Sequence, residues 1–227
     1  KEYGATNIII RSKPPAIAAV EGNVKIYGLT RLDFERITAR TAGASSPLVI
    51  NTIERAVPMR EMSMEVRHFD RTCDVQLLGV MKEYQEINHL EIDHGRFLSR
   101  GDTEVKGNVA VLAYGTAMEL FPYENPIGKT LRLDQDFYRI VGVTSKKQDA
   151  AAIGGSISGR SYNKDVYIPL ATFRARLGDQ VPVSIESFES ELVEINQITV
   201  TVNSVDRVPE TAALIRVLLG ELHDKEN

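Results

Sequence analysis

The two ends of the chain each combine a strand pattern with a helix pattern, and this feature most limits the possible folds. Near the start, the β-branched run at residues 6–11 is typical of a buried strand. Near the end, Ile198, Val200 and Val202 alternate with threonines, which predicts a strand with one buried face. Neither strand has an obvious partner nearby in the sequence. We therefore expect the two ends to form one subdomain that is split by an insertion.

Each end also predicts a helix. Thr30 is a suitable N-cap, and Asp33 three residues later completes a variant of the capping box. At the other end, Pro209 suits a first helical turn, and a helix is predicted over residues 210–223. We expect its inner face to consist of Ala213, Leu214, Val217 and Leu218, widened by Ile215 and Leu219.

Two strands are predicted after the first helix. Met62, Met64 and Val66 alternate with polar residues, which indicates a strand with one wet face, and residues 73–80 predict a second strand. Cys73 is the single cysteine, and beside a strand-like run we expect it to be a small buried apolar residue.

The middle of the chain predicts a compact, strand-rich subdomain. Short strands are expected at residues 109–112, 130–133, 138–143 and 165–168, and helical segments at 84–94 and 113–120. The stretch 150–161 is rich in glycine and serine and is interpreted as an exposed, mobile loop. The fold class is therefore α+β, with residues 1–80 plus 186–227 in a β/α subdomain and residues 81–185 as the inserted strand-rich subdomain.

Composition argues against nucleic-acid binding. The chain has 27 Lys and Arg against 31 Asp and Glu, a net charge of −4, and no stretch basic enough to follow a phosphate backbone. No segment approaches the ~20 apolar residues of a membrane helix. The first residue is Lys1 rather than Met, so we expect a fragment or processed chain whose membrane anchors lie outside it.

The sequence contains no complete catalytic or metal-binding motif. Gly128-Lys129-Thr130 matches the end of a phosphate-binding loop, but Tyr123 stands where its first glycine belongs, and a strand rather than a helix follows. We interpret residues 125–128 as a tight turn. His89 and His94 are five residues apart, so a solvated helix end is favoured over a metal site.

The serines of the chain likewise lack the setting of a nucleophile. No Gly-x-Ser-x-Gly elbow occurs, and Ser156 has no general base nearby in the sequence. We therefore predict no enzyme activity, no cofactor and no metal.

Several motifs occur in a fixed order along the chain. The strand-like run at residues 4–11 comes first, and Gly95-Arg96-Phe97-Leu98, within residues 90–98, is followed by the acidic Asp102. The next motifs are VAVL at 109–112, LFP at 120–122, NPIGK at 125–129 and RIVGV at 139–143. In combination they resemble the extracytoplasmic core domain of MacB-like permeases of the ATP-binding-cassette class, in which residues 4–11 resemble the strand after the first membrane helix and residues 90–98 resemble the "G-R-x-[FL]" segment. Ala113-Tyr114 departs from the family's pattern, because a glycine is usual there.

The resemblance implies an architecture and a role. Such domains pair a porter-like β/α subdomain, built from both chain ends, with an inserted strand-rich "sabre" subdomain. They lie on the extracytoplasmic face of the bacterial inner membrane and relay motion driven by ATP hydrolysis in a cytosolic domain or subunit. The implied partners are that ATP-binding subunit or domain, a second permease copy and a periplasmic adaptor protein.

Two sets of residues follow as candidates for that role. The candidate partner-contact loop comprises Gly154, Gly155, Ser156, Ile157, Arg160 and Tyr162. The candidate hinges, where the insertion leaves and rejoins the β/α subdomain, are Gly79, Val80, Val183 and Ser184. A free-standing periplasmic ligand-binding or sensor module on the same scaffold is the alternative function, and it would require a concave apolar pocket.

Overall fold

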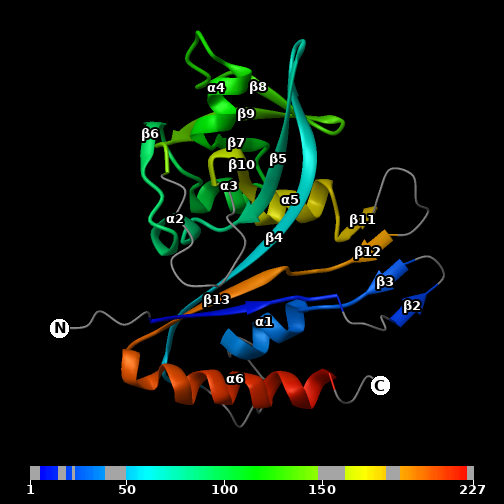
Figure 1. The fold of residues 1–227 in the computed structure, drawn as a ribbon, viewed down its shortest axis with the longest axis vertical. Coiled ribbons are helices and arrows are strands. Elements are labelled where there is room, and N and C mark those ends of the chain that lie inside the picture. Colours follow the sequence, from blue (N-terminus) through cyan, green and yellow to red (C-terminus); the bar gives the residue numbers. More distant parts are fainter. Residues whose placement is uncertain are drawn as a thin grey trace. The chain divides into compact units, whose positions relative to one another are not determined.

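The computed structural model describes residues 6–14, 19–21, 24–38, 50–147, 162–182 and 190–223. The chain divides into two compact units, whose elements are labelled in Figure 1. The first is built from both ends of the chain, Lys1–Pro58 and Asp179–Asn227, and the second is the continuous stretch Met59–Gly178. The predicted boundaries, after residues 80 and 185, differ from this division. Residues 59–80 belong to the second unit because they form a hairpin whose second strand pairs with a later strand of that unit.

The first unit contains strands from both ends of the chain. Its elements are β1 (Asn7–Arg11), β2 (Ala19–Glu21), β3 (Val24–Ile26), α1 (Arg31–Thr38), β11 (Gln180–Pro182), β12 (Ser190–Leu192), β13 (Gln197–Val202), a 3-10 turn (Val205–Arg207) and α6 (Val208–His223). β1 and β13 pair antiparallel over five residues, from Asn7 opposite Thr201 to Arg11 opposite Gln197. β11, β12, β3 and β2 form a small separate sheet in that order.

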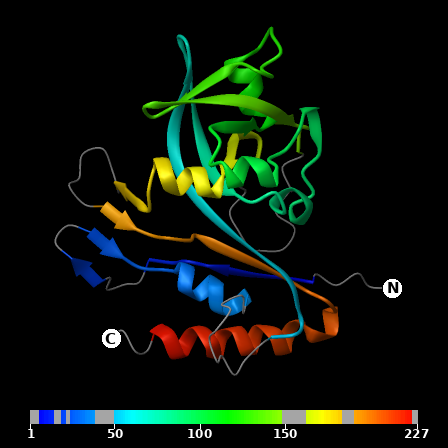
Figure 2. The same cartoon turned by 180° about the vertical axis from the view of Figure 1, so that it is seen from behind.

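Helices α1 and α6 lie on the same side of the β1–β13 pair (Figure 2). The three apolar residues predicted to face the core from β13 are buried, but Thr199 is only 7% exposed, so the alternation is confirmed only in part. The apolar core of the unit consists of Leu29, Ile37, Ile195, Ile198, Val200, Ile215 and Leu218. This unit therefore joins the two chain ends through one shared core, which hydrophobic burial stabilises.

The predictions for the two helices of the first unit were confirmed to different extents. The cap of α1 is confirmed: the Thr30 amide donates to Asp33 Oδ2 at 2.7 Å, and the Asp33 amide donates to Thr30 Oγ1 at 3.1 Å. The inner face of α6 was predicted only in part. Ile215 and Leu218 are buried with Thr211, whereas Ala213 is exposed and Val217 is 57% exposed. The many apolar residues of this helix define a broad stripe, and only packing decides which edge of it is covered.

The second unit contains the remaining elements. They are most of β4 (Ile53–His68), β5 (Arg71–Val80), α2 (Tyr84–Ile87), β6 (Ile92–Gly95), α3 (Arg100–Glu104), β7 (Val109–Leu112), α4 (Tyr114–Leu120), β8 (Thr130–Leu133), β9 (Asp136–Thr144), a 3-10 turn (Tyr162–Lys164), β10 (Asp165–Pro169) and α5 (Leu170–Arg176). The predicted strands at residues 109–112, 130–133, 138–143 and 165–168 are confirmed, as is the helix within 113–120.

The strands of the second unit form a closed ring of pairings. Their order is β4-β5-β10-β7-β9, and β8 pairs with both β9 and β4, which closes the ring. The β8–β4 seam consists of two residue pairs, Val66 with Leu133 and Arg67 with Arg132. The ring encloses a core that includes Leu77, Leu112, Leu131, Tyr138, Ile140, Val166 and Ile168. Closure leaves few free strand edges, which is how barrels avoid edge-to-edge aggregation.

The helix predicted over residues 84–94 is wrong beyond its first turn. α2 ends at Ile87, His89 has a positive φ of 50°, and β6 begins at Ile92. A non-glycine residue in the left-handed region ends a helix because its successors cannot continue the hydrogen-bond pattern. β6 then pairs with β9. Tertiary pairing therefore overrides a local pattern that favoured a helix.

Among the described residues, no helix has both the length and the apolar character needed to cross a bilayer.

Candidate functional site

The segment from Gly95 to Asp102, which the family resemblance singled out, lies where β6 ends and α3 begins. Gly95 has a φ of 76°, and a Cβ atom there would overlap the carbonyl oxygen of Val141. A Cβ atom on Gly142 would overlap the carbonyl oxygen of Arg96. The Arg96 amide donates to the Val141 carbonyl at 2.9 Å. Both glycines therefore allow the two backbones to approach closely enough for this hydrogen bond.

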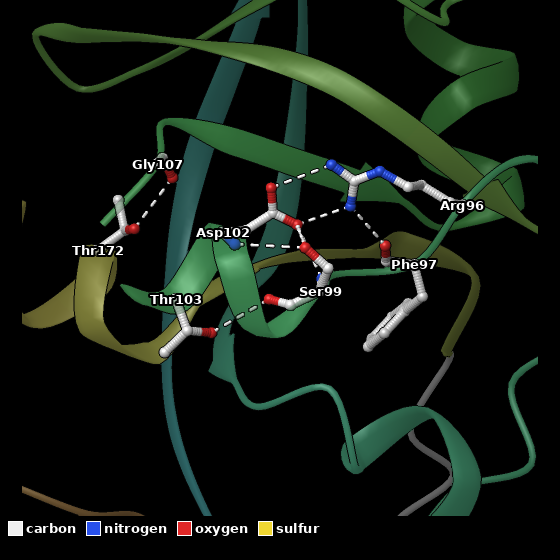
Figure 3. A network of polar contacts seen from close by, with 7 residues as sticks. All are labelled: Arg96, Phe97, Ser99, Asp102, Thr103, Gly107 and Thr172. Carbon is white, nitrogen blue, oxygen red and sulfur yellow. Dashed lines mark hydrogen bonds and ion pairs between the residues drawn. The ribbon is translucent and has the colours of Figure 1, made fainter. Parts of the chain in front are cut away.

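Arg96 and Asp102 form a bidentate ion pair at this point, shown in Figure 3. Arg96 Nη1 donates to Asp102 Oδ2 at 2.6 Å, and Nη2 donates to Oδ1 at 3.0 Å. Nη1 also donates to the Phe97 carbonyl at 2.9 Å. The Arg96 guanidinium lowers the pKa of Asp102 to about 2, with further hydrogen bonds from Ser99, against an opposing effect of burial. The same pair raises the pKa of Arg96.

Asp102 also closes a capping box with Ser99 (Figure 3). The Ser99 amide and hydroxyl each donate to Asp102 Oδ2 at 2.7 Å, and the Asp102 amide donates to Ser99 Oγ at 3.3 Å. One carboxylate thus caps α3 and binds the arginine that follows β6. We call Arg96, Ser99 and Asp102 the arginine clasp; its charged groups are paired within the protein. Its geometry indicates a structural role.

Among the described residues, Cys73 and His94 have surroundings that account for them without catalysis. Cys73 is 2% exposed, and burial raises the pKa of its thiol to about 12, so the thiol is inert at neutral pH. His94 Nδ1 lies 2.8 Å from Asp93 Oδ2 on the surface. Within the part of the chain that the structure describes, no cluster of three or more histidine, cysteine, aspartate or glutamate side chains has the arrangement of a metal site.

The candidate partner-contact loop lies mostly outside the described residues. This applies to Gly154, Gly155, Ser156, Ile157 and Arg160, whereas Tyr162 is the first residue of a 3-10 turn. The two ends of this segment are held together by Asn163, whose Nδ2 donates to the Lys147 carbonyl at 3.0 Å and whose Oδ1 accepts from the Lys147 amide at 3.2 Å. Lys147 Nζ in turn donates to the Asn88 carbonyl at 2.8 Å. These hydrogen bonds therefore hold the residues on either side of the segment, Lys147 and Asn163, at a defined position in the second unit.

The candidate hinge residues Gly79 and Val80 lie within β5, away from the boundary between the units. Gly79 is opposite Arg60 on β4 and Ile168 on β10, and a Cβ atom there would lie 2.7 Å from Phe173 Cβ. Val80 is fully buried. A strand paired on both sides is a poor place for bending. Val183 and Ser184 lie outside the described residues.

A surface hollow in the second unit was missed by sequence reasoning. It lies beside the β8–β4 seam and is lined by Arg67, His68, Phe69, Thr130, Arg132 and Phe137. Phe69 is 82% exposed and Phe137 is 64% exposed. The exposed position of Arg67 followed from the alternation of its strand. Its position opposite Arg132 did not, because residues 67 and 132 meet only when the ring closes.

Comparison with known proteins identifies the family. Residues 4–218 match the model of the MacB-like periplasmic core domain. The chain belongs to this family. Among similar full-length proteins, the macrolide export ATP-binding/permease protein MacB of Marinobacter nauticus is 28% identical over 181 residues, which is 78% of the chain and 25% of the relative. The probable syringafactin export ATP-binding/permease protein SyfD of Pseudomonas syringae is 30% identical over 107 residues, which is 47% of the chain and 16% of the relative. The chain thus spans about a quarter or less of the length of these relatives.

Solved structures confirm a mixed, strand-rich α+β fold of the MacB-like type. The periplasmic region of MacB from Actinobacillus actinomycetemcomitans has a TM-score of 0.65 and 19% identity, and the match covers 97% of this chain and 86% of that one. The extracellular domain of the noncanonic transporter YknZ from Gram-positive bacteria has a TM-score of 0.63 and 16% identity, with 86% and 84% covered. At these identities the likeness establishes the fold alone.

Proposed function

We propose that this MacB-like core domain is the extracytoplasmic part of an ABC transporter permease and relays ATP-driven motion of membrane helices to extracytoplasmic partners. The observation that carries the proposal is the family match, which extends over residues 4–218 and so leaves little of the chain for another function. The relatives named above combine ATP-binding and permease parts in one protein, of which this domain corresponds to a fraction. ATP hydrolysis would therefore take place in a separate domain or subunit.

We further propose that the first unit is the porter-like part and the second unit the sabre-like part. The first unit contains both chain ends, which is where the family's membrane helices would connect. The chain crosses between the units at Pro58–Met59 and at Gly178–Asp179. Gly178 has a φ of 75°, and a Cβ atom added to it would meet no other atom within 4 Å. It is therefore better suited to bending than the pair Gly79–Val80, which lies inside a strand.

The candidate partner-contact loop, Gly154 to Tyr162, remains our proposal for a partner contact. Asn163 binds the Lys147 backbone and so ties the chain before the loop to the chain after it, which supports a role in passing a partner's contact to the second unit. Substituting Ile157→Ser and Arg160→Ala together in the parent protein tests this. We expect transport to fall while the melting temperature of the 227-residue chain stays unchanged; unaltered transport would contradict the proposal.

Topology labelling tests the proposed location. The chain's own Cys73 is buried and has a raised pKa, so it provides a silent background for a maleimide that cannot cross membranes. In the parent protein, Arg100→Cys would place a thiol where the native side chain is 81% exposed. We expect labelling of this variant on intact spheroplasts to exceed clearly that of the unsubstituted protein. Labelling only after the inner membrane is permeabilised would refute the extracytoplasmic assignment.

A transport assay tests the proposed role. Deleting the ATP-binding part of the parent protein, or its separate subunit, should abolish export although the core domain still folds. Export that persists without any ATPase would contradict the proposal.

A further inference from the structure

The hollow beside the β8–β4 seam, which we call the hairpin hollow, is built by three strands. Arg67, His68 and Phe69 come from the end of β4 and its turn, Thr130 and Arg132 from β8, and Phe137 from β9. Arg67 lies directly opposite Arg132, and Arg132 lies directly opposite Phe137. All these residues belong to the second unit. The strand register therefore fixes the relative positions of two cations and an aromatic ring.

The two arginines of the hairpin hollow are oriented by the backbone rather than by acids. Arg67 Nε donates to the Phe69 carbonyl at 2.9 Å, and Arg132 Nε donates to the Asp134 carbonyl at 2.8 Å. Within the described ranges, neither guanidinium forms a salt bridge. Like charges directly opposite each other destabilise a sheet, so the fold itself gains nothing from this pair.

Nearby acids do not neutralise the arginines. Glu65 and Asp74 lie opposite each other on the same hairpin, and Asp70 and Asp134 lie in the adjoining turns. Among the described residues, none of these acids forms an ion pair with Arg67 or Arg132. A broad anionic surface such as a bilayer would meet these carboxylates together with the arginines, whereas a short segment with a few carboxylates can contact the two arginines alone.

Phe69 supplies an independent observation. His68 pairs with Arg71, so Phe69 and Asp70 form a two-residue turn, and Phe69 adopts a φ of 52°. Bulky side chains rarely take this left-handed conformation, and glycine would take it without strain. The ring is 82% exposed, so burial does not compensate for the strain. Strain retained at an exposed aromatic residue points to a contact made outside the chain.

The side chains beneath the hollow are packed against the core of the second unit. The His68 ring lies 4.5 Å from the Phe69 ring and 4.2 Å from the buried Phe121 ring, measured between centroids. His68 Nδ1 lies 2.7 Å from the Thr130 carbonyl oxygen. The stack therefore connects the exposed ring to the core of the second unit, so a ligand would meet a surface that is already organised.

We propose that the hairpin hollow binds a short acidic and apolar segment of an extracytoplasmic protein partner. A carboxylate of the segment would lie between Arg67 and Arg132, because guanidinium groups bind carboxylates through paired hydrogen bonds. An adjacent apolar side chain would pack between Phe69 and Phe137, since exposed aromatic residues are common anchors of protein interfaces. The inference rests on the proposed function, because it names the surface by which the domain would hold a partner of the transporter.

Peptide binding to the 227-residue chain tests the inference. The probes are fluorescently labelled decapeptides in which Asp alternates with Leu, Val or Phe, and matched peptides with Lys in place of Asp. We expect at least one acidic peptide to bind in fluorescence anisotropy, more weakly as salt is added, and the lysine peptides not to bind. Equal binding of acidic and basic peptides, or no binding by the folded chain, would overturn the inference.

Variants locate the binding. The double variant Arg67→Gln/Arg132→Gln should weaken binding of the acidic peptide roughly a hundredfold, since each of the two lost charge-assisted contacts is worth about one decade in Kd. Phe69→Gly should also weaken binding while keeping or raising the melting temperature. Arg100→Gln removes an exposed arginine on α3 and is the matched control, with unchanged affinity. Unchanged affinity in the double variant would refute the assignment to this surface.

Two further measurements distinguish a protein partner from lipid, and the failure of this inference from the failure of the proposed function. Vesicles of phosphatidylglycerol should not bind the chain through these arginines; loss of vesicle binding in the double variant would instead assign the hollow to lipid and overturn the inference. In the parent protein, the double variant should reduce transport without loss of protein level. If the parent protein showed no ATP-dependent transport, the proposed function would fail, while the peptide result would still decide the inference by itself.

Discussion

Two arginine arrangements in the second unit differ in how their charges are used. In the arginine clasp, Arg96 makes two hydrogen bonds to Asp102, and that carboxylate also caps α3. In the hairpin hollow, Arg67 and Arg132 lie opposite each other. The clasp satisfies its charges internally and so contributes to folding, whereas the hollow places two like charges together at a cost to folding. All three arginines are exposed in part, so exposure does not distinguish them. An arginine bound by a carboxylate of its own chain has a structural role, whereas arginines without such a carboxylate are available to bind a partner.

The largest loss of stability is expected at Gly142, where the backbone lies closest to that of Arg96. Gly142→Ala would force a Cβ atom into the Arg96 carbonyl oxygen, a backbone atom that cannot move aside cheaply. We expect a loss of about 3 kcal/mol or more in the free energy of unfolding, measured by urea denaturation. Gly101→Ala, where the nearest atom would be 3.8 Å away, is the control and should change the free energy of unfolding by no more than about 1 kcal/mol. Similar effects of the two substitutions would show that the close approach is unimportant.

Removing the shared carboxylate should have the next largest effect. Asp102→Ala removes the carboxylate that binds Arg96 and that accepts the hydrogen bond from the Ser99 amide in the capping box. We therefore expect a loss of about 2 kcal/mol in the free energy of unfolding, again measured in urea. Arg96→Lys retains the charge but not the paired geometry and should cost less. A loss in Arg96→Lys equal to that in Asp102→Ala would indicate that the arginine, not the cap, dominates the clasp.

Acidification should weaken the clasp in a defined range. The pKa of Asp102 is lowered from the ordinary 3.8 to about 2 in the folded chain. Its stabilising contribution is therefore complete above the ordinary pKa and is lost as pH falls from about 4 through about 2, because the unfolded state binds the proton more readily. The difference in unfolding free energy between the native chain and Asp102→Asn should shrink over this range. A difference that stays constant with pH would exclude the charge as its origin.

The smallest change in the free energy of unfolding is expected for a substitution in the hairpin hollow. Arg132→Gln relieves the repulsion with Arg67, so we expect the free energy of unfolding to stay the same or to rise by roughly 0.2–1 kcal/mol. The same substitution should weaken peptide binding. A clear loss of stability in Arg132→Gln would show that this arginine is structural after all, and the contrast with the clasp would fail.

Much of the local structure could be predicted from neighbouring residues in the sequence. The capping pair Thr30 and Asp33, the buried strand at residues 109–112 and the tight turn ending at Gly128 depend on neighbouring residues, and all three are found in the structure. The cap, the strand and the turn can be predicted because their causes lie within a few residues of each other. The ordered motifs also identified the family, although the close approach that one of them serves, between Gly142 and Arg96, joins residues far apart in the sequence.

Tertiary structure alone decided what depends on long-range register. The helix expected over residues 84–94 gives way to β6 because β9 supplies a pairing partner about fifty residues away, beyond the range of local patterns. The same applies to the unit boundary at Pro58–Met59, which follows from the pairing of the β4–β5 hairpin. Arg67 and Arg132 each fit an ordinary exposed strand position, and only closure of the ring between β8 and β4 brings them together as a site.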